Sequence, residues 1–470
     1  MRCCVYPGRK NRRLLRISLA SVGPLALFVF LALAGGAETS LEAYAKGKIA
    51  AVEKTYDVRL VGAKTRGGAE PFGKIYHVTN LQDAGPGSLR YALHRTGPRI
   101  IVFDIAGIIH LKSDLKIFSP SVTIAGQTAP KPGITLSGAT LRIRTSDVIV
   151  QHIAIRPGPS DNPKVSVKRD AITISQCSKC KVPPRGILID QLTLTWSSDE
   201  LIGIAGPNSR QITIRNCLLA EALNRSGHPK GSHSAAILIG GAARGVEIVG
   251  NLFANNVYRN PAVNPGGAVM IANNYIYNPH NMAVHVNAGP KSRRKTIVSV
   301  VGNLMEAGPD TRTNVSVVWL ARNIAWRTPN AALYIVGNKN LKHGIKNISN
   351  PSGLKLRKRS PLEMLNWKML PLGQVRNWVL RYAGSRPSKR NQVDKRIIEG
   401  VASRTGRIID VPKQVGGLAA RKAVHRVARV PKHPFSRSRT GQMLRIEVWL
   451  CRQHFIVGGA ANAQCNSPSL

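Results

Sequence analysis

The sequence has few acidic and few aromatic residues. Its 470 residues include 23 Asp and Glu against 68 Lys and Arg, and aromatic residues make up only 5%. The formal net charge of +45 favours polyanionic partners of any kind, including nucleic acid, acidic polysaccharide and anionic lipid. We find no recognised nucleic-acid-binding motif with aromatic stacking positions. The sequence therefore predicts no nucleic-acid partner, and charge alone does not choose among the other polyanions.

The sequence also lacks an apolar run long enough to span a membrane. The apolar run from Leu25 to Ala34 is too short for that task. Basic residues precede this run, and the small residues Gly35, Gly36 and Ala37 end it. This order of segments predicts a secretory signal peptide over residues 1–37. We therefore expect no membrane span and a secreted or periplasmic protein.

Cysteine gives little guidance. An odd number would remain after removal of the signal peptide: Cys177, Cys180, Cys217, Cys451 and Cys465. Cys177 and Cys180 form a single C-x-x-C without a second pair or a histidine at zinc-site spacing. A disulfide within a loop is the favoured interpretation of this pair in an oxidising compartment, ahead of a metal site.

Helical periodicity is scarce until late in the chain. Short runs rich in Val and Ile, such as IIVFDIAGII, VTIAG and DVIVQHIAI, follow one another too closely for a helix between each pair. One short helix is expected from Leu89 to Leu93, with Ser88 as its cap. An aliphatic run that ends in Asn recurs later in the chain, at Asn216, Asn251, Asn274, Asn303, Asn323 and Asn338.

This recurrence predicts the coils of a parallel β-solenoid with insertions. In such a fold, an Asn at a bend adopts left-handed geometry and hydrogen-bonds to its equivalent in the next coil. Sandwich and propeller folds are the competing interpretations, but they explain one Asn per coil less simply. From about Gly353 the sequence becomes dense in Lys and Arg, with helical pieces such as MLRIEVWLCRQHF. We expect this part to pack along the solenoid and to cover its exposed end.

Several motifs in order carry a family resemblance. VTNLQDAGPGSLRYAL (78–93), TIAGQTAP (123–130), TWSSDE (195–200) and NLFANNVYRNP (251–261) together resemble secreted pectate lyases. The resemblance runs from about Phe72 to Gly337. It implies an all-β fold, a right-handed parallel β-helix with a partly helical basic C-terminal extension. The expected division is a signal peptide over 1–37, a lead-in over 38–70, the β-helix over 71–345 and the extension over 346–470.

The resemblance also implies a function. Such enzymes cleave pectate or polygalacturonate by β-elimination and depend on Ca²⁺, which stabilises charge developing on the uronate carboxylate. We therefore expect an acidic polysaccharide as the partner of a monomeric enzyme. Asp170 and Asp199 match metal-ligand positions, and Glu200 is a third candidate, in keeping with the preference of Ca²⁺ for carboxylate oxygens. Each of these acids alone is equally compatible with a solvated loop.

Arg259, within the motif RNP, matches the arginine that removes the proton in this family. An ordinary guanidinium stays protonated and cannot accept a proton, so nearby cations must lower its pKa if it is the base. The alternative is a protonated clamp on a substrate carboxylate, for which its planar fork is suited.

The sequence departs from the family pattern at four positions. Gln191 replaces a usual histidine, Ala235 and Ala262 lie where basic residues are common, and Gly203 lies near a further metal carboxylate. Contacts to substrate are instead assigned to three other residues: His228, Lys230 and His233. The departures favour one alternative function, a non-catalytic polysaccharide-binding β-helix. A glycoside hydrolase on the same scaffold is the other, although no pair of carboxylates suited to flank a glycosidic bond is evident.

Overall fold

The structure is a computed structural model that describes residues 62–465 with several gaps. The gaps are residues 71, 161, 163, 165–167, 179, 290–293, 343, 363–367, 420–421, 439–440, 442 and 463–464. The chain divides into two units, Met1–Lys46 and Gly47–Leu470, and all described residues belong to the second. The predicted signal peptide over 1–37 lies outside the described residues. In the described part of the chain, no helix has the length and apolar character needed to cross a membrane.

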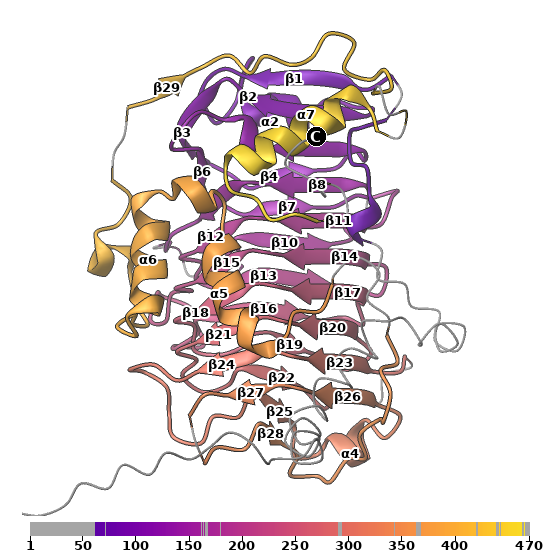
Figure 1. Cartoon of the computed structure of the whole chain (residues 1–470), viewed down its shortest axis with the longest axis vertical. Helices are drawn as coiled ribbons and strands as arrows, with labels where there is room; N and C mark the ends of the chain where they lie inside the picture. Colours follow the sequence, from indigo (N-terminus) through magenta and orange to yellow (C-terminus); the bar gives the residue numbers. More distant parts are fainter. Residues whose placement is uncertain are drawn as a thin grey trace, which may run out of the picture. The chain divides into compact units, whose positions relative to one another are not determined.

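Short strands stack into three sheets (Figure 1). Sheet 1 contains, in spatial order, β1 (Lys74–Val78), β2 (Arg99–Phe103), β5 (Val122–Ala125), β8 (Val148–Gln151), β11 (Arg185–Asp190), β14 (Arg210–Arg215), β17 (Arg244–Val249), β20 (Ala268–Ala272), β23 (Ile297–Val301) and β26 (Ala332–Val336). Sheet 2 contains β28 (Ile348–Ser349), β25 (Val318–Leu320), β22 (Val284–Val286), β19 (Ala262–Val263), β16 (Ala235–Ile239), β13 (Glu200–Ala205), β10 (Ile172–Ser175), β7 (Leu141–Ile143) and β4 (Leu115–Ile117). Sheet 3 contains β27 (Lys339–Asn340), β24 (Leu304–Glu306), β21 (Tyr275–Tyr277), β18 (Leu252–Ala254), β15 (Leu218–Ala220), β12 (Thr193–Thr195), β9 (Ile153–Arg156), β6 (Ile134–Ser137), β3 (Ile105–His110) and β29 (Val424–His425).

The chain enters these sheets in a fixed order. From β2 to β28, each coil places one strand in sheet 1, then one in sheet 3, then one in sheet 2. Strands of successive coils pair in parallel, as β14 does with β11 and β17. The predicted parallel β-helix is therefore confirmed, and the sandwich and propeller alternatives are excluded.

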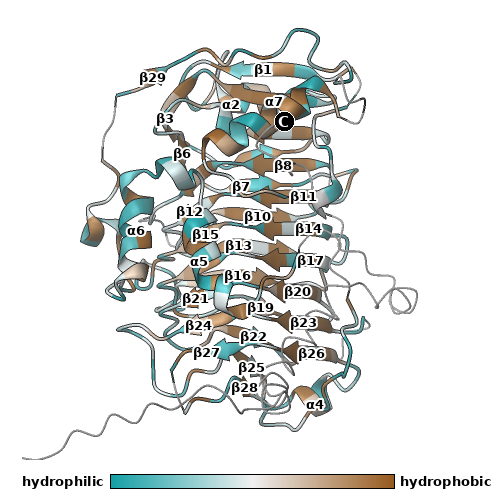
Figure 2. Cartoon of the chain, in the orientation of Figure 1, coloured by the Kyte–Doolittle hydropathy of each residue, from teal (hydrophilic) through white to brown (hydrophobic). Residues whose placement is uncertain are grey.

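Aliphatic side chains fill the interior of the coils. In the register of sheet 1, Ile212 lies between Ile187 and Val246, and all three side chains are fully buried. Figure 2 shows the same concentration of hydrophobic residues on the strands. Burial of such side chains contributes about 25 cal/mol per Å² of apolar surface. β-branched residues suit these strands because they pack well on a pleated surface.

A ladder of buried asparagines runs along the corner between sheets 1 and 3. Nδ2 of Asn251 donates to Oδ1 of Asn274 at 2.9 Å, and the same contact joins Asn274 to Asn303 and Asn303 to Asn338, at 2.9 and 2.8 Å. The prediction that an Asn of one coil bonds its equivalent in the next is confirmed at these four positions.

The predicted bond to the next coil was wrong at Asn216 and Asn323, although Asn216 does have the predicted left-handed conformation, with φ of +51°. Asn216 lies one residue before the ladder, because the N–H of Cys217 is the group that donates to Oδ1 of Asn251, at 2.9 Å. Asn323 instead precedes the short helix α4 (Ile324–Arg327). The left-handed conformation also belongs to the residue before each rung, as at Gly250, with φ of +64°. One residue thus adopts the left-handed conformation of the bend, and the Asn that follows it forms the hydrogen bond to the next coil.

The helices lie outside the coils. Those in the described residues are α2 (Leu89–Leu93), α4, α5 (Leu372–Tyr382), α6 (Gln392–Ala402) and α7 (Arg445–Ile456), with the short 3-10 helices η2 (Gly62–Lys64), η3 (Gly126–Thr128), η4 (Pro387–Lys389) and η5 (Pro412–Val415). The predicted helix from Leu89 to Leu93 is confirmed, and Oγ of Ser88 accepts a hydrogen bond from the N–H of Tyr91 at 3.2 Å.

The C-terminal extension packs on two faces of the β-helix (Figure 1). α5 and α6 cover sheet 3 through a shared apolar cluster, and α7 covers the first strands of sheet 1. β29 pairs antiparallel with β3 and so covers an edge of sheet 3. The extension is partly helical, as predicted, but most of it lies along the flanks of the coils and not over their end.

Gln191 anchors this extension. Its Nε2 donates to the carbonyls of Tyr382 and Gly384, at 2.6 and 3.0 Å, and its Oε1 accepts from the N–H of Ala460 at 3.0 Å. Gln191 follows β11 at the corner between sheets 1 and 3. This departure from the family pattern therefore serves packing of the extension.

Two disulfides are present among the described residues. Cys177 and Cys180 are joined, as predicted, and Cys451 in α7 is joined to Cys465. Cys217 is a buried free thiol.

Candidate functional site

Most of the predicted site residues meet at one edge of sheet 2. Asp170 lies just before β10, Asp199 just before β13, Glu200 begins β13 and Arg259 lies just before β19. Parallel strands in register place their starting ends side by side. Ligand oxygens of Asp170, Asp199 and Glu200 consequently lie within 4.8 Å of one another.

Asp170 is a buried acid with two hydrogen-bond partners. Its Oδ2 accepts from the hydroxyl of Thr173 at 2.8 Å, and its Oδ1 accepts from the N–H of Glu200 at 3.1 Å. Burial, followed by repulsion from Asp199, raises the pKa of Asp170 well above its ordinary value. The cluster therefore concentrates negative charge that the protein itself does not fully balance.

Arg259 forms an ion pair with Glu200, in which Nη1 contacts Oε1. The residue has φ of +58°, an uncommon conformation for a side chain of this size, and its guanidinium lies 4.9 Å from the ring centre of Tyr258. Burial lowers the pKa of Arg259, while Asp199 and Asp170 oppose that shift. The ion pair with Glu200 acts in the same direction as these two acids, so the guanidinium is held in its charged form.

The acid cluster fits a calcium ion. All of its ligand atoms are carboxylate oxygens, the type that Ca²⁺ binds, and the three acids exceed the one arginine by two charges when all are ionised. A Cβ on Gly203 would come within 2.7 Å of Oδ2 of Asp170. The absence of a side chain there leaves room beside this oxygen. Asp170, Asp199 and Glu200 are thus the residues that would hold the ion.

A second group of possible ligands comprises Asp199, His228 and His233. Nδ1 of His228 accepts a hydrogen bond from the N–H of Lys230 at 3.1 Å, so the neutral ring carries its proton on Nε2. That nitrogen faces Oδ1 of Asp199 at 3.8 Å, and a protonated nitrogen has no lone pair for a metal. This group is therefore better suited to hydrogen bonding than to metal binding.

The two histidines are buried beneath the acid cluster. Their rings stack with centres 3.9 Å apart and planes 10° apart, and Nε2 of His233 lies 2.9 Å from Oδ1 of Asp199. Burial, then His233, lowers the pKa of His228, which favours the neutral ring. Lys230 is exposed. The predicted contact of these three residues with substrate stays a prediction.

A row of aligned residues crosses sheet 2 beside the cluster. In register it contains Arg142, Thr173, Gly203, Leu238, Ala262, His285 and Trp319. The family departures at Gly203 and Ala262 fall on this row, and Ala235 pairs with Glu200 at the start of β16. Ala235 and Ala262 are fully buried, and Gly203 is partly buried. Neither Tyr258 nor Trp319 was predicted from the sequence, although Tyr258 adjoins Arg259 in the chain.

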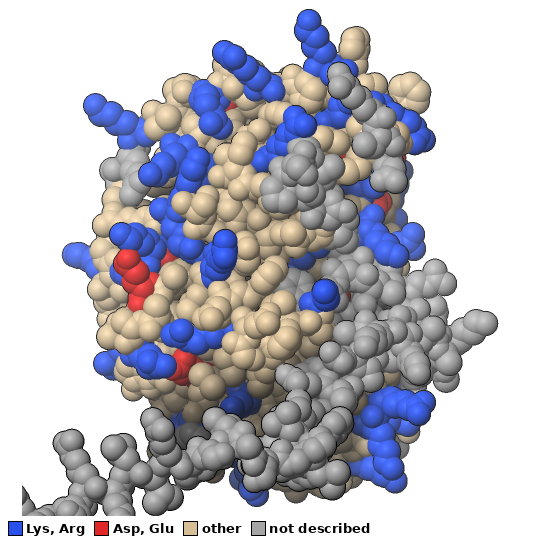
Figure 3. Space-filling model, viewed as in Figure 1, with Lys and Arg blue, Asp and Glu red and all other residues tan. Residues whose placement is uncertain are grey.

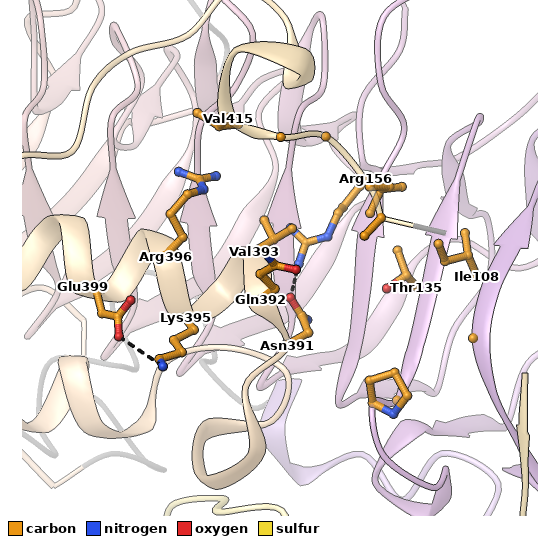
Figure 4. Close-up of a pocket in the computed structure, with 17 residues that line it drawn as sticks. Ile108, Thr135, Arg156, Asn391, Gln392, Val393, Lys395, Arg396, Glu399 and Val415 are labelled. Atoms are coloured by element: carbon orange, nitrogen blue, oxygen red, sulfur yellow. Dashed lines mark hydrogen bonds and ion pairs between the residues drawn. The ribbon is translucent and has the colours of Figure 1, made fainter. Parts of the chain in front are cut away.

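Among the described residues, cavities also lie outside this cluster. One, of about 400 Å³, lies between α6 and sheet 3 (Figure 4). Its charged groups are largely paired with one another: Lys395 with Glu399, and buried Arg156 with Asp394. Another, of about 900 Å³, includes Tyr258 and His280 in its lining.

Comparisons with known proteins agree with the sequence motifs. No protein-family model matches the chain. A probable pectate lyase C of Aspergillus terreus is 38% identical over 254 residues, which cover 53% of each chain. The corresponding protein of Aspergillus flavus is 35% identical over 251 residues, again 53% of each chain. The resemblance to pectate lyases is confirmed. The chain spans about half the length of these curated relatives.

Solved structures were also compared with this pectate-lyase-like chain. A Bacillus subtilis pectate lyase is 16% identical, with a TM-score of 0.49, over 70% of this chain and 95% of that one. A pectate lyase bound to a hexasaccharide is 16% identical, with a TM-score of 0.49, over 72% of this chain and 96% of that one. The major allergen of cedar pollen is 19% identical, with a TM-score of 0.48, over 72% of this chain and 95% of that one.

Proposed function

We propose that the protein is a calcium-dependent lyase that cleaves pectate or a similar acidic polysaccharide by β-elimination. The observation that carries this proposal is the convergence of Asp170, Asp199, Glu200 and Arg259 at one edge of sheet 2. Curated relatives named as probable pectate lyases support it. Figure 3 shows Lys and Arg spread over one face with few acids, which suits a polyanionic substrate.

The reaction removes the C5 proton of a uronate while the oxygen at C4 leaves. Calcium, when bound, supplies Lewis-acid stabilisation of the charge that develops on the uronate carboxylate. Arg259 is the proposed base that takes up the C5 proton. Burial already lowers its pKa, and release from Glu200 would remove a carboxylate that opposes proton loss.

Arg259 in its charged form has a second proposed task. Its guanidinium fork can hold a substrate carboxylate before the proton moves. The loop geometry supports both tasks, because Arg259 lies in the turn that precedes β19, with φ of +58°, and is paired with Glu200. Secretion or export to the periplasm, and action as a monomer, are further parts of this proposal.

A non-catalytic polysaccharide-binding protein is the second candidate function. It is favoured by Gly203 and Ala262, since both lack the charged side chains common at these positions in the family. A binding protein would retain polymer on the same face without producing new chain ends.

One experiment separates the two functions. Purified protein is incubated with polygalacturonate in the presence of Ca²⁺ and, separately, of a chelator. We expect ultraviolet absorbance from the unsaturated uronide product to rise with Ca²⁺ and to stop with the chelator. New reducing ends without this absorbance would indicate hydrolysis, and binding without either signal would indicate the non-catalytic alternative.

A further inference from the structure

Tyr258, His233 and Asp199 form a continuous chain of hydrogen bonds behind the acid cluster. The hydroxyl of Tyr258 lies 3.0 Å from Nδ1 of His233, and Nε2 of His233 lies 2.9 Å from Oδ1 of Asp199. His233 is 1% exposed, so water has little access to replace these contacts. The three residues come from three different loops between sheet 3 and sheet 2.

The donors in this chain can be assigned from chemistry. Burial raises the pKa of Tyr258 to about 12, so its hydroxyl keeps its proton and can donate to Nδ1. A neutral His233 then carries its proton on Nε2 and donates it to Asp199. His228, stacked on His233, presents a second protonated Nε2 to the same oxygen at 3.8 Å.

This arrangement occupies one oxygen of Asp199 and leaves the other available. Both histidines approach Oδ1, whereas Oδ2 accepts no hydrogen bond from any described residue. A carboxylate held through one oxygen cannot rotate freely about its terminal bond. Its second oxygen is therefore fixed in direction.

We propose that Tyr258 and His233 are positioning residues that orient the Asp199 carboxylate for metal binding, with the stacked ring of His228 as their support. The inference rests on the proposed function, since Asp199 is there a calcium ligand. Hydrogen-bonding partners of metal ligands commonly set ligand orientation and affinity. Here the direct partner of Asp199 is His233. Tyr258, which bonds to His233, also contacts Arg259 by its ring, so it links the proposed metal ligand to the arginine through one intervening histidine.

The test measures calcium binding directly, without substrate. Isothermal titration calorimetry with CaCl₂ is carried out on the full chain and on Tyr258→Phe, which keeps the ring over Arg259 and removes only the hydroxyl. We expect the Kd for Ca²⁺ to rise by about tenfold or more, in line with other changes to partners of metal ligands. His233→Leu should act in the same direction, whereas His233→Gln keeps an N–H donor and should recover part of the loss.

Tyr334→Phe is the matched control, because Tyr334 is a partly buried tyrosine in β26 of sheet 1. Its calcium affinity should equal that of the unchanged protein. In activity assays, Tyr258→Phe should raise the half-saturating Ca²⁺ concentration more than it lowers kcat at saturating Ca²⁺. Melting curves recorded in a chelator establish that each variant is folded.

The outcomes are distinguishable from failure of the proposed function. If the unchanged protein binds Ca²⁺ and both Tyr258→Phe and His233→Leu bind it equally well, the positioning role is overturned while the metal centre stands. If the unchanged protein binds no Ca²⁺, both the proposed metal centre and the positioning role are contradicted. A change of kcat alone, at constant calcium affinity, would also count against the inference.

Discussion

Arg259 is held between two influences of opposite sign. Burial favours the neutral guanidine, whereas the neighbouring acids favour the charged form. If it is the base, we expect Arg259→Ala to lower kcat by at least about 100-fold with little change in KM, since a general base contributes about 10²–10⁴-fold. Arg259→Lys should retain some turnover with a shifted pH profile.

Steady-state kinetics on polygalacturonate check this prediction, with Arg95→Ala as a control at an exposed arginine. A rise in KM that exceeds the fall in kcat in both variants would point to the clamp instead. Near-normal activity of Arg259→Ala would remove the residue from the site.

Asp170 is expected to determine the calcium requirement. Replacing it with Ala removes a proposed ligand oxygen. Burial and repulsion from Asp199 raise the pKa of Asp170, so its ionised form is disfavoured in the folded protein. The half-saturating Ca²⁺ concentration should therefore rise strongly in Asp170→Ala, while thermal stability in a chelator is retained or improved. Unchanged calcium dependence in both Asp170→Ala and Asp199→Ala would exclude the cluster as the metal site.

Glu247 is a buried acid of sheet 1, and its titration should appear in the stability of the fold. Burial raises its pKa from 4.5 to about 7, and a hydrogen bond from Thr213 opposes this shift. The folded state therefore binds the proton more tightly than the unfolded chain. Stability is greatest below the unfolded pKa and falls as pH rises through about 7, by about 3 kcal/mol for this group. Glu247→Gln should remove this part of the pH dependence in denaturant unfolding at pH 5 and pH 8, and an unchanged slope would contradict the assignment.

At the residue scale, the sequence indicated which loops carry charged residues, but it did not indicate how deeply the side chains of those loops are buried. The motifs singled out Asp170, Asp199 and Arg259, which the structure brings close together, and their roles stay predictions. His228 and His233 were predicted to contact substrate, but their burial beneath Asp199 was not predicted, because it depends on loops from different coils that no local pattern reveals. Tyr258 was overlooked for the same reason.

The asparagine ladder illustrates the scale of the element. Oδ1 of Asn274 accepts from both the N–H and Nδ2 of Asn251, and Nδ2 of Asn274 donates to Ile248 and Asn303. Asn274→Ala should lower the free energy of unfolding by about 3 kcal/mol or more, since each buried polar group left unpaired costs about 1–3 kcal/mol. Asn287→Ala, at a half-buried Asn with one partner, should cost less. If chemical denaturation gives equal losses of unfolding free energy for the two variants, the ladder bonds contribute no more to stability than the single side-chain bond of Asn287.

The strands and the coil order could be predicted because short β-branched runs, bounded by Gly and Asn, have a local physical cause. The Asn repeat predicted the ladder. It did not show which of two neighbouring residues adopts the left-handed conformation and which forms the hydrogen bond, since both are polar or small. Packing of α5 and α6 on sheet 3 was not predictable in detail. It depends on Gln191 and on apolar contacts between segments far apart in the chain.

At the scale of the whole molecule, charge should govern how long polymer is retained. The formal charge of +45 attracts a polyanion over its whole length, and salt screens this attraction over about 10 Å at 0.1 M and about 3 Å at 1 M. We expect KM for long polygalacturonate to rise steeply with NaCl, and KM for short oligomers to rise less. Kinetics with both substrates across a salt series check this prediction, and equal salt dependence would confine the electrostatic interaction to the immediate surroundings of Arg259 and the acid cluster.

The ladder also constrains how a gene for such a fold can change. Each rung from Asn251 to Asn338 requires a partner in the next coil, so length can be gained or lost there only in units of a complete coil. The loops between sheet 3 and sheet 2 are free of that restriction, because they carry no rung. Insertions and deletions should therefore accumulate in the loops that bear Asp170, His233 and Arg259, and new specificities can arise there while the coils stay in register.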